Sequence, residues 1–358
     1  MTTEHRDAEP TNSRPPSMAD VATVAGVSHQ TVSRVLNDHP NVREDTRQRV
    51  LQAIEQMGYR RNRAARALAT ARTSTIGILT VGNSNFGPAN TVLGIESAAR
   101  AEGYFVSVSS LEASDAAGAQ LALGHLVDQG VDGIIVVAPL AEVAQVVERA
   151  SLNVPVVVVA ANPLAEPTDA LRYVCADQRF GARAVTEYLI ELGHRQIAHV
   201  VGQENWIDAA ERRTEWRKVL EEHAVQGREY RAEGWSAADG YAVGRQVADD
   251  IAAGQGPTAV FAANDYIALG LLRALWERGL QVPDDVSVVG FDDVESSAFY
   301  IPALTTVRQP FGALGKSAMS ALSALSAGEP GGEGRFAATL EPELIVRAST
   351  APPRAAKD

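Results

Sequence analysis

The sequence predicts an N-terminal all-α helix-turn-helix head joined to an α/β body of two doubly wound parallel-sheet subdomains. Three observations predict this fold class. Two short helical patterns meet at Gly26, and a third follows them. From Thr75 onward, short apolar strands alternate with amphipathic helices, which is typical of parallel sheets covered on both faces. This alternation occurs in two successive series, and 358 residues are enough to bury a core for each.

The net charge is divided unevenly along the chain. It is −12 overall, yet residues 1–72 carry 11 Arg and no Lys against 8 acidic residues, which gives +3. The remainder carries 21 basic and 36 acidic residues, which gives −15. A basic head on an acidic body is typical of a protein that meets nucleic acid at one end only. The clustered arginines are Arg60, Arg61, Arg63, Arg66 and Arg72.

Composition also bears on the compartment. The one cysteine, Cys175, excludes an internal disulfide framework and fits a reducing environment. The N-terminus has no apolar signal core, and no apolar run approaches the roughly 20 residues that a membrane span requires. We therefore expect a cytoplasmic protein.

The head is predicted to span residues 17–59, after a polar tail of residues 1–16 that we expect to be disordered. Its first helix begins after Ser17, because Asp20 stands three residues later in a capping arrangement. Its second helix begins after Ser28, whose side chain can accept a hydrogen bond from a first-turn backbone amide. A third helix follows a short loop.

One face of the second helix is polar throughout. Its residues follow the spacing i, i+1, i+4, i+5 and i+8, which places them together with no apolar side chain to bury. Amides, hydroxyls and one guanidinium suit the base edges of a DNA major groove. On spacing alone, a small surface helix hairpin is the alternative. The residues are His29, Gln30, Ser33, Arg34 and Asn37.

Residues 60–74 form a basic connection between head and body. Arginine and alanine favour a helix there, but Leu68 is nearly alone as a large apolar side chain, so the segment cannot fold stably by itself. One interpretation is a flexible basic linker. The other is a hinge helix that orders only on DNA, with its arginines near phosphates and Leu68 wedged into a minor-groove base step.

The body is predicted to span residues 75–350 as two facing lobes. Ligands bind at the carboxyl ends of strands in such sheets, so two facing lobes create a cleft. The expected strands are 75–79, 104–108, 133–137 and 155–160, then 173–176, 196–201, 258–263 and 286–291, and finally 305–310 and 338–348. The expected boundaries are about 75–172 plus 305–327 for the first lobe, about 173–304 plus 336–350 for the second, and 351–358 for a tail.

This organisation resembles the LacI/GalR family of sugar-responsive repressors, whose body is similar to periplasmic binding proteins. The resemblance runs from about Ser17 to Ser349 and is strongest with the lac-type members of the family. Four segments carry it: DVATVAGVSHQTVSRVLN (20–37), NRAARALA (62–69), ANDYIALG (263–270) and VVGFDDVESSAFYIPALTTVRQPF (288–311).

The resemblance implies roles in the head and hinge. Arg34 could bond guanine bidentately and Gln30 could contact adenine. His29 stands where lac-type members carry Tyr, so we expect the operator to differ there, and Arg43 replaces a small hydroxyl residue before the third helix. The base-reading positions are His29, Gln30 and Arg34, and the backbone-contacting positions are Ser28, Thr31, Ser33 and Asn37. The minor-groove positions are Asn62, Arg63, Ala65, Arg66 and Leu68.

The resemblance also implies an effector site in the cleft. A carboxylate accepts from vicinal sugar hydroxyls while a guanidinium or amide donates to them, and an aromatic ring lies against the apolar face of the sugar. Ala160 and Val81 stand where lac-type members have polar cleft residues, so the identity of the sugar cannot be carried over from those members. The implied effector residues are Asp208, Arg212, Trp235, Asn264, Asp292, Gln309 and Phe311, with Trp206 as a second stacking platform.

The expected protein is a homodimeric repressor of carbohydrate (galactoside-type) genes that a small sugar releases from operator DNA. The tail has no heptad pattern, so a dimer is the natural expectation. A nucleobase or nucleoside effector is the alternative within the family. We expect no cofactor, no metal and no membrane partner.

Two other classes of protein compete with this interpretation. An α/β enzyme could use Asp177, Asp292 or Asp293 as acid and base, but the sequence has no nucleophile elbow, metal cluster or phosphate-binding loop. We therefore expect no enzymatic activity. A sugar-binding transport component would share the two-lobed body, yet it should carry a secretory signal and no DNA-binding head.

Overall fold

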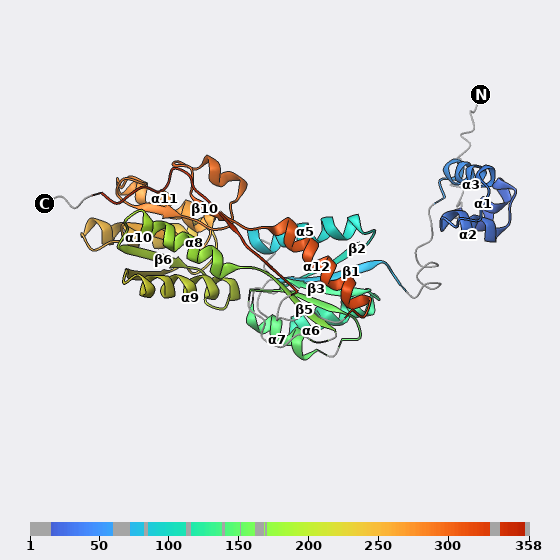
Figure 1. Cartoon of the computed structure of the whole chain (residues 1–358), viewed down its shortest axis with the longest axis horizontal. Coiled ribbons are helices and arrows are strands. Elements are labelled where there is room, and N and C mark those ends of the chain that lie inside the picture. The colour runs from blue at the N-terminus through green and yellow to red at the C-terminus, as the bar shows by residue number, and fades with distance from the viewer. Residues whose placement is uncertain are drawn as a thin grey trace, which may run out of the picture. The chain divides into compact units, whose positions relative to one another are not determined.

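The computed structural model describes residues 16–59, 72–81, 85–111, 116–137, 140–150, 152–161, 168, 170–329 and 337–354. The chain divides into two compact units, the head up to Ala71 and the body from Arg72 onward. Figure 1 labels the helices and strands of both units. No helix among the described residues is long and apolar enough to cross a membrane.

The head consists of three helices. The predicted cap of α1 is confirmed, since Ser17 and Asp20 form a reciprocal capping box, and Gly26 ends the helix in the left-handed conformation with φ 66°. The predicted cap of α2 is also confirmed, because the Thr31 backbone amide donates to Ser28 Oγ over 3.1 Å. The helices are α1 (Met18–Ala25), α2 (His29–Leu36) and α3 (Glu44–Met57).

A small apolar core holds the three helices together. α1 contributes Val21, α2 contributes Val32 and Val35, and α3 contributes Val50, all of them buried. Because the apolar side of α2 packs into this core, its polar face remains at the surface of the head.

The first part of the body is the N-lobe, residues 72–176 and 311–340. Its six strands are parallel, in the order β11-β5-β4-β3-β1-β2, and helices cover both faces of the sheet. Helices α5 and α12 pack on one face and α6 and α7 on the other. The elements are β1 (Thr75–Val81), α5 (Phe86–Ala101), β2 (Phe105–Leu111), α6 (Ala116–Asp128), β3 (Gly133–Val137), α7 (Ala141–Arg149), β4 (Val156–Val159), β5 (Leu171–Ala176), α12 (Phe311–Ser326) and β11 (Ala338–Leu340).

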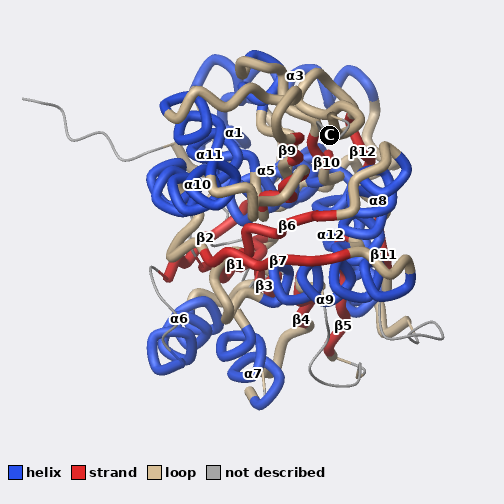
Figure 2. The backbone as a smooth tube through the Cα atoms, turned by 90° about the vertical axis from the view of Figure 1, so that its left-hand side faces the viewer, coloured by secondary structure: helices blue, strands red, loops and turns tan. Residues whose placement is uncertain are grey.

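The second part is the C-lobe, residues 177–309 and 343–354. Four parallel strands in the order β7-β6-β8-β9 lie between α8 and α9 on one face and α10 and α11 on the other, and Figure 2 shows helices flanking the strands. The elements are α8 (Gln178–Glu191), β6 (Gln196–Val201), α9 (Ile207–Glu222), β7 (Gln226–Arg231), α10 (Ala237–Ala252), β8 (Ala259–Ala262), α11 (Asp265–Glu277), β9 (Ser287–Val289), the 3-10 helix η1 (Glu295–Phe299), β10 (Thr306–Arg308) and β12 (Glu343–Ile345).

The chain passes between the lobes three times. The first crossover joins β5 to α8, the second joins β10 to α12, and the third joins β11 to β12. β10 and β12 pair antiparallel, and a bridge between Val289 and Thr305 ties them to the C-lobe sheet. All three crossovers run beside the carboxyl ends of strands, which is where a cleft forms in this fold.

Three sequence-based boundaries inside the body are wrong. Residues 173–176 were expected in the second lobe, but β5 pairs with β4 of the N-lobe. Residues 305–308 were expected in the first lobe, but β10 pairs with β12. The strand expected at 338–348 is two strands in different lobes, because β11 pairs with β5 and Pro342 interrupts the run. An apolar run shows that a strand is buried and does not show which sheet it joins.

Residues 351–354, which were expected to belong to a tail, instead pack against the C-lobe. Arg354 forms ion pairs with Asp284 and Asp285 at 2.8 and 2.7 Å, and the Ala351 backbone amide donates to Ser287 Oγ. Residues 351–354 therefore belong to the C-lobe surface.

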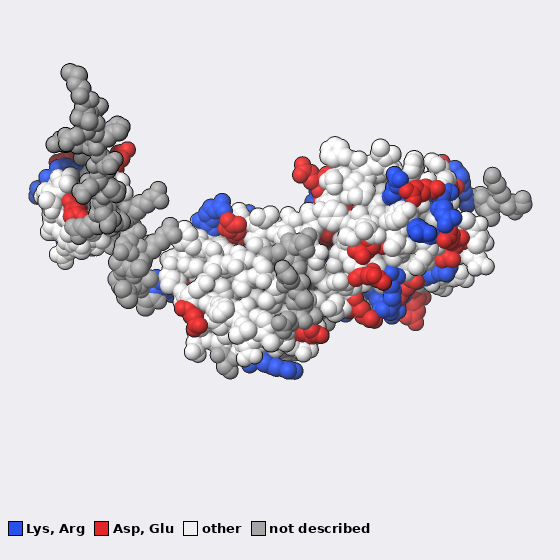
Figure 3. Space-filling model, turned by 180° about the vertical axis from the view of Figure 1, so that it is seen from behind, with Lys and Arg blue, Asp and Glu red and all other residues white. Residues whose placement is uncertain are grey.

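Charged side chains are unevenly distributed over the body. On the face in Figure 3, Lys, Arg, Asp and Glu gather on the C-lobe while most of the N-lobe surface is uncharged.

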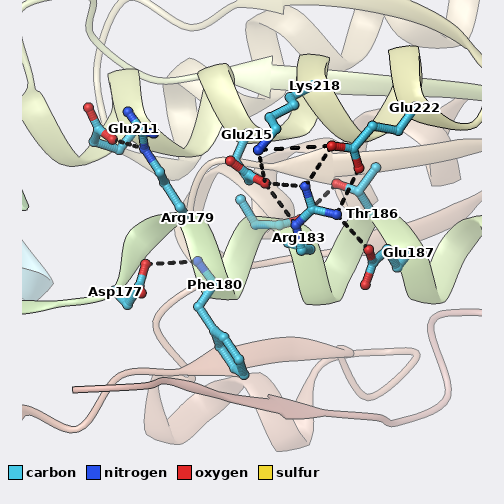
Figure 4. A network of polar contacts seen from close by, with 11 residues as sticks. Asp177, Arg179, Phe180, Arg183, Thr186, Glu187, Glu211, Glu215, Lys218 and Glu222 are labelled. Atoms are coloured by element: carbon cyan, nitrogen blue, oxygen red, sulfur yellow. Dashed lines mark hydrogen bonds and ion pairs between the residues drawn. The ribbon is translucent and has the colours of Figure 1, made fainter. Parts of the chain in front are cut away.

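A network of ion pairs joins α8 to α9. Arg183 of α8 lies at its centre and contacts Glu187, Glu215 and Glu222 at 2.8, 2.5 and 2.9 Å (Figure 4). The Glu215 side chain is only 6% exposed, and it contacts both this guanidinium and, at 4.0 Å, the Lys218 ammonium.

Candidate functional site

A cavity lies between the two lobes of the body. The N-lobe contributes the ends of β3, β4 and β5 and the start of α5, and the C-lobe contributes the starts of α9 and α11 and the loop after β9. The crossovers contribute Gln178, Gln309 and Phe311. All eight predicted effector residues line this one cavity: Trp206, Asp208, Arg212, Trp235, Asn264, Asp292, Gln309 and Phe311.

Arg212 is held rigidly within the C-lobe wall. Its side chain is buried on α9, its Nε donates to Gln178 Oε1 over 2.8 Å, and its Nη1 donates to the Ala263 carbonyl over 2.5 Å. The guanidinium carbon lies 3.9 Å from the centroid of the Phe291 ring, a stacked cation–π contact. Arg212 is therefore already in place for a ligand, with the unused donors of the guanidinium fork still available.

A directional chain of hydrogen bonds links Arg212 to Asp292. Arg212 donates to Gln178, Gln178 Nε2 donates to Gln309 Oε1 over 2.8 Å, and Gln309 Nε2 donates to Asp292 Oδ1 over 2.7 Å. Gln178 begins α8 after the first crossover, and Gln309 lies on the second. The two crossovers are thus joined by an amide pair that fixes a cation at one end and a carboxylate at the other.

The loop that carries Asp292 is held in an unfavourable backbone conformation. Asp292 has φ 112° and Asp293 has φ 53°, values that residues other than glycine rarely adopt. Asp293 anchors the loop, since it contacts Arg347 at 2.6 Å and Arg308 at 2.7 Å. Although burial opposes them, these hydrogen bonds hold the pKa of Asp293 below its usual value. Asp293 is structural, and it leaves Asp292 to face the cavity.

Burial shifts the pKa of the ionisable groups around the cavity. It raises the pKa of Asp292 to about 6, with Arg212 and the hydrogen bond from Gln309 acting in the opposite direction. Burial likewise raises the pKa of Asp208 and lowers that of Arg212. The charged forms lack water here, so a ligand that forms hydrogen bonds with them replaces lost hydration.

Aromatic side chains complete the cavity wall. The Trp206 and Trp235 rings lie 4.9 Å apart at a tilt of 56°, and Trp235 Nε1 is buried with no hydrogen-bond partner among the described residues. Phe86 of α5 packs edge-to-face against Phe311, with ring centroids 5.8 Å apart. These rings can cover the apolar face of a sugar or of a planar heterocycle.

Asn264 and Asp265 have roles that the sequence did not separate. Asn264 is the N-cap of α11, since its Oδ1 accepts from the Ile267 amide over 2.8 Å. Asp265 is fully buried and accepts hydrogen bonds from Thr306 Oγ1 and the Val294 amide. It therefore supports the loop that carries Asp292.

The lobes also touch directly beside the cavity. The Asp208 carboxylate accepts a hydrogen bond from the backbone of Ala161, which belongs to the N-lobe. Trp206 forms a bridge with Leu140 and packs into the apolar cluster on that face of the N-lobe. Asp208 and Trp206 thus contact both the cavity and the opposite lobe.

In the head, α2 presents the predicted polar face. His29, Gln30 and Arg34 are exposed, and no hydrogen bond or ion pair engages the Arg34 side chain among the described residues. The predicted backbone-contacting residues lie nearby: Ser28 Oγ is 2.9 Å from Thr31 Oγ1, and Asn37 Nδ2 is 3.5 Å from Ser33 Oγ. Arg43 precedes α3 and provides no side-chain cap. The predicted minor-groove positions Asn62, Arg63, Ala65, Arg66 and Leu68 lie outside the described residues.

Sequence reasoning missed several residues of the cavity. Gln178 is the most consequential, because it connects Arg212 to Gln309. One signal could have found it: Gln178 follows closely after the carboxyl end of a parallel strand, where ligand-facing side chains gather. Asn85, Phe86 and Cys175 also line the cavity, and they too lie at or shortly after the carboxyl ends of strands, β1 for the first two and β5 for Cys175.

A helix-turn-helix head with an exposed polar helix, joined to two lobes around a cavity, defines a class of ligand-responsive DNA-binding proteins. Comparisons with known proteins agree. The family model described as bacterial regulatory proteins, lacI family, matches residues 17–62, and a periplasmic binding protein-like domain matches residues 186–350. The chain belongs to the LacI family of bacterial transcriptional regulators, so the family prediction is confirmed.

Individual relatives cover most of the chain. The lactose operon repressor of Escherichia coli is 38% identical over 86% of this chain and 83% of its own length. The transcriptional repressor PurR of Vibrio campbellii is 31% identical over 92% of this chain and 97% of its own length. The crystal structure of the lac repressor dimer bound to operator and the anti-inducer ONPF has a TM-score of 0.82 at 36% identity, covering 94% of this chain and all of that one.

Proposed function

We propose that this protein is a homodimeric transcriptional repressor that a small sugar, of the galactoside type, releases from its operator. The observation that carries the proposal is the fixed pair of Arg212 and Asp292 in the interlobe cavity. A vicinal diol donates to a carboxylate and accepts from a guanidinium, so one diol satisfies both groups. The tryptophans beside the pair offer faces for the sugar ring.

The head supports the DNA-binding half of the proposal. In this proposal His29, Gln30 and Arg34 read bases, while Ser28, Thr31, Ser33 and Asn37 contact phosphates. Leu68 and its neighbouring arginines would order in the minor groove, as the hinge sequence predicts. A repressor that meets its operator in this way acts in the cytoplasm.

A dimer is the assembly that this mode of DNA binding requires. Two heads related by a two-fold axis place their α2 helices in successive major grooves of a pseudo-palindromic operator. The related lac repressor was crystallised as a dimer bound to operator, which supports the same assembly here.

A nucleobase is the second candidate effector. Phe86, Phe311, Trp206 and Trp235 line the cavity, and their faces would stack on a planar base as well as on a sugar. The paired carboxylate and guanidinium favour the sugar, because they match the two adjacent hydroxyls of a diol. A purine edge carries single, alternating donors and acceptors and has no such diol.

The experiment is a thermal-shift panel of mono- and disaccharides, purines and nucleosides on the full chain. We expect a sugar to raise the melting temperature and to release a DNA fragment selected from a random pool. The Arg212→Ala variant should lose the response to sugar, whereas Arg213→Ala should keep it, because Arg213 faces Glu229 outside the cavity. Stabilisation by purines alone would replace the sugar with the second candidate.

A further inference from the structure

The two halves of the cavity wall differ in chemistry. The C-lobe and the crossovers supply carboxylates, a guanidinium and amides, whereas the residues of the N-lobe strand ends that line the cavity carry no side-chain oxygen or nitrogen. The one heteroatom there is the Cys175 sulfur, a weak donor that lies 3.8 Å from Thr339 Oγ1. These strand-end residues are Val137, Val159, Ala160, Ala161, Cys175 and Ala176.

The polar side chains that the described N-lobe does bring to the cavity lie elsewhere. Asn85 and Thr91 belong to the start of α5, beside the Phe86 and Phe311 pair, and the Thr91 hydroxyl donates to the Gly87 carbonyl. The apolar part of the wall is therefore local to the strand ends. Val137, Val159 and Ala160 are each less than 9% exposed, so this wall lies deep in the body.

The polar wall determines which edge of a sugar meets the apolar wall. This step rests on the proposed sugar site. If Arg212 and Asp292 hold the 2- and 3-hydroxyls, the opposite edge of the pyranose is the C5–O5 edge, which carries the C5 substituent and faces the strand ends. The Asp208 carboxylate at the margin of this wall already accepts a hydrogen bond from the Ala161 backbone. A hydroxyl against Val137, Val159 and Ala160 would therefore find no free side-chain partner among the described residues, and a site without a matching group disfavours it by about tenfold or more.

We propose that the effector is a pyranose whose C5 atom carries hydrogen or a methyl group rather than a hydroxymethyl group. Within the galactoside type proposed above, the ligand is thus the galacto-configured pentopyranose or 6-deoxyhexose, with its hydroxyls toward the C-lobe and its bare edge against Val137, Val159 and Ala160. A C5 methyl group against the apolar wall makes the binding free energy more favourable, since burying one methyl or methylene group is favourable, and a C5 hydrogen is accommodated without loss.

The test compares sugars that share their ring hydroxyls and differ only at C5. In the galacto series these are D-galactose, D-fucose and L-arabinose, and in the gluco series D-glucose, 6-deoxy-D-glucose and D-xylose. Binding of each to the full chain is measured by calorimetry. In the series that binds, we expect the 6-deoxy sugar or the pentose to bind at least tenfold more tightly than the hydroxymethyl sugar.

Equal or tighter binding of the hydroxymethyl sugar would overturn this inference while leaving the sugar site intact. Failure of every sugar in both series to bind would overturn the sugar proposal itself, and this inference with it.

Two substitutions test the wall directly. Val137→Thr and Ala160→Ser each add one hydroxyl with little change in volume. We expect either change to reduce the preference for the deoxy sugar severalfold. The matched control is Val108→Thr on the exposed edge strand β2, outside the cavity, which should leave the preference unchanged. If both wall variants behave like this control, the strand ends do not face C5 and the proposed orientation is wrong.

Discussion

At the scale of single residues, the cavity depends on a carboxylate in an unfavourable setting. Asp292 is buried, adopts φ 112°, and receives hydrogen-bond support from Gln309. Arg212 and Asp208 are the charged groups that act on it most strongly. A buried carboxylate with free lone pairs costs stability in the ligand-free protein, and that cost is recovered when a ligand donates to it.

The raised pKa of Asp292 predicts a pH dependence of stability. Its value of about 6 exceeds that of an unfolded aspartate, so the folded protein keeps a proton that the unfolded chain has already released. This group therefore makes the protein less stable as pH rises from about 4 to about 6, by on the order of 3 kcal/mol in total. Asp292→Asn should remove that contribution.

The measurement is denaturation of wild type and Asp292→Asn at several pH values, and the quantity compared is the difference between the two. Carboxylates far from Asp292 titrate alike in both proteins and cancel in this difference, whereas Asp208 and Asp265, whose charges interact with Asp292, cancel only in part. An identical pH dependence in both proteins would show that Asp292 titrates normally.

Gln178 predicts a second effect at this scale. Replacing it with Leu removes the acceptor of Arg212 Nε and the donor to Gln309, so buried polar groups lose their partners. We expect a loss of about 1–3 kcal/mol in unfolding free energy and weaker sugar binding. Gln203→Leu is the control, because the Gln203 amide makes an exposed hydrogen bond to the Glu233 carbonyl. Equal effects of the two variants would contradict the role of Gln178.

At the scale of elements, the ion-pair network between α8 and α9 secures the helix that carries Arg212. Figure 4 shows Arg183 of α8 reaching Glu215 and Glu222 of α9, with Lys218 nearby. Apolar packing of Leu189, Trp216 and their neighbours lies beneath these charges. The network therefore adds orientation to helices that the core already brings together.

Removing the centre of this network should destabilise the body. Arg183→Ala removes the 2.5 Å contact of the buried Glu215 and leaves it the longer 4.0 Å contact with Lys218, and we expect a loss of about 1–3 kcal/mol. Arg100→Ala, which removes an exposed pair with Glu96 on α5, should change stability by less than about 1 kcal/mol. Chemical denaturation followed by far-UV circular dichroism compares them, and similar losses in both variants would show that the α8–α9 network is not special.

At the scale of the whole molecule, the proposed regulation is a coupling between the sugar site and the DNA-binding head, in which a ligand at one site lowers the affinity of the other. The crossovers join the lobes, and the amide pair Gln178–Gln309 links the crossovers to the cavity. A ligand that changes how the lobes meet can therefore act on the segment that leads to the head. The size of such coupling is typically about 1–3 kcal/mol.

Linkage predicts that the coupling is reciprocal. If a sugar weakens operator binding by a given factor, saturating operator should weaken sugar binding by the same factor, in the range of roughly 5- to 150-fold. Fluorescence anisotropy gives the first factor and calorimetry on the DNA complex gives the second. Operator binding should also weaken steeply as salt rises, because phosphate contacts release counterions. Operator binding that stays unchanged at saturating sugar would contradict the proposed coupling between the two sites.

The sequence by itself determined the order and type of most elements. The caps at Ser17 and Ser28, the polar face of α2 and the alternation of strands and helices are local patterns, and neighbours within a few residues decide them. The motif around Asp292 and the resemblance it carries also came from sequence. All eight expected effector residues line the cavity for this reason.

Only the tertiary structure decided which sheet β5, β10 and β11 join, because apolar strands look alike whichever neighbour they pair with. It alone brought Gln178 between Arg212 and Gln309, 34 and 131 residues away in the chain. It also placed an apolar strand-end wall opposite a polar one. These features depend on contacts between distant segments, and such contacts exist only once the chain has folded.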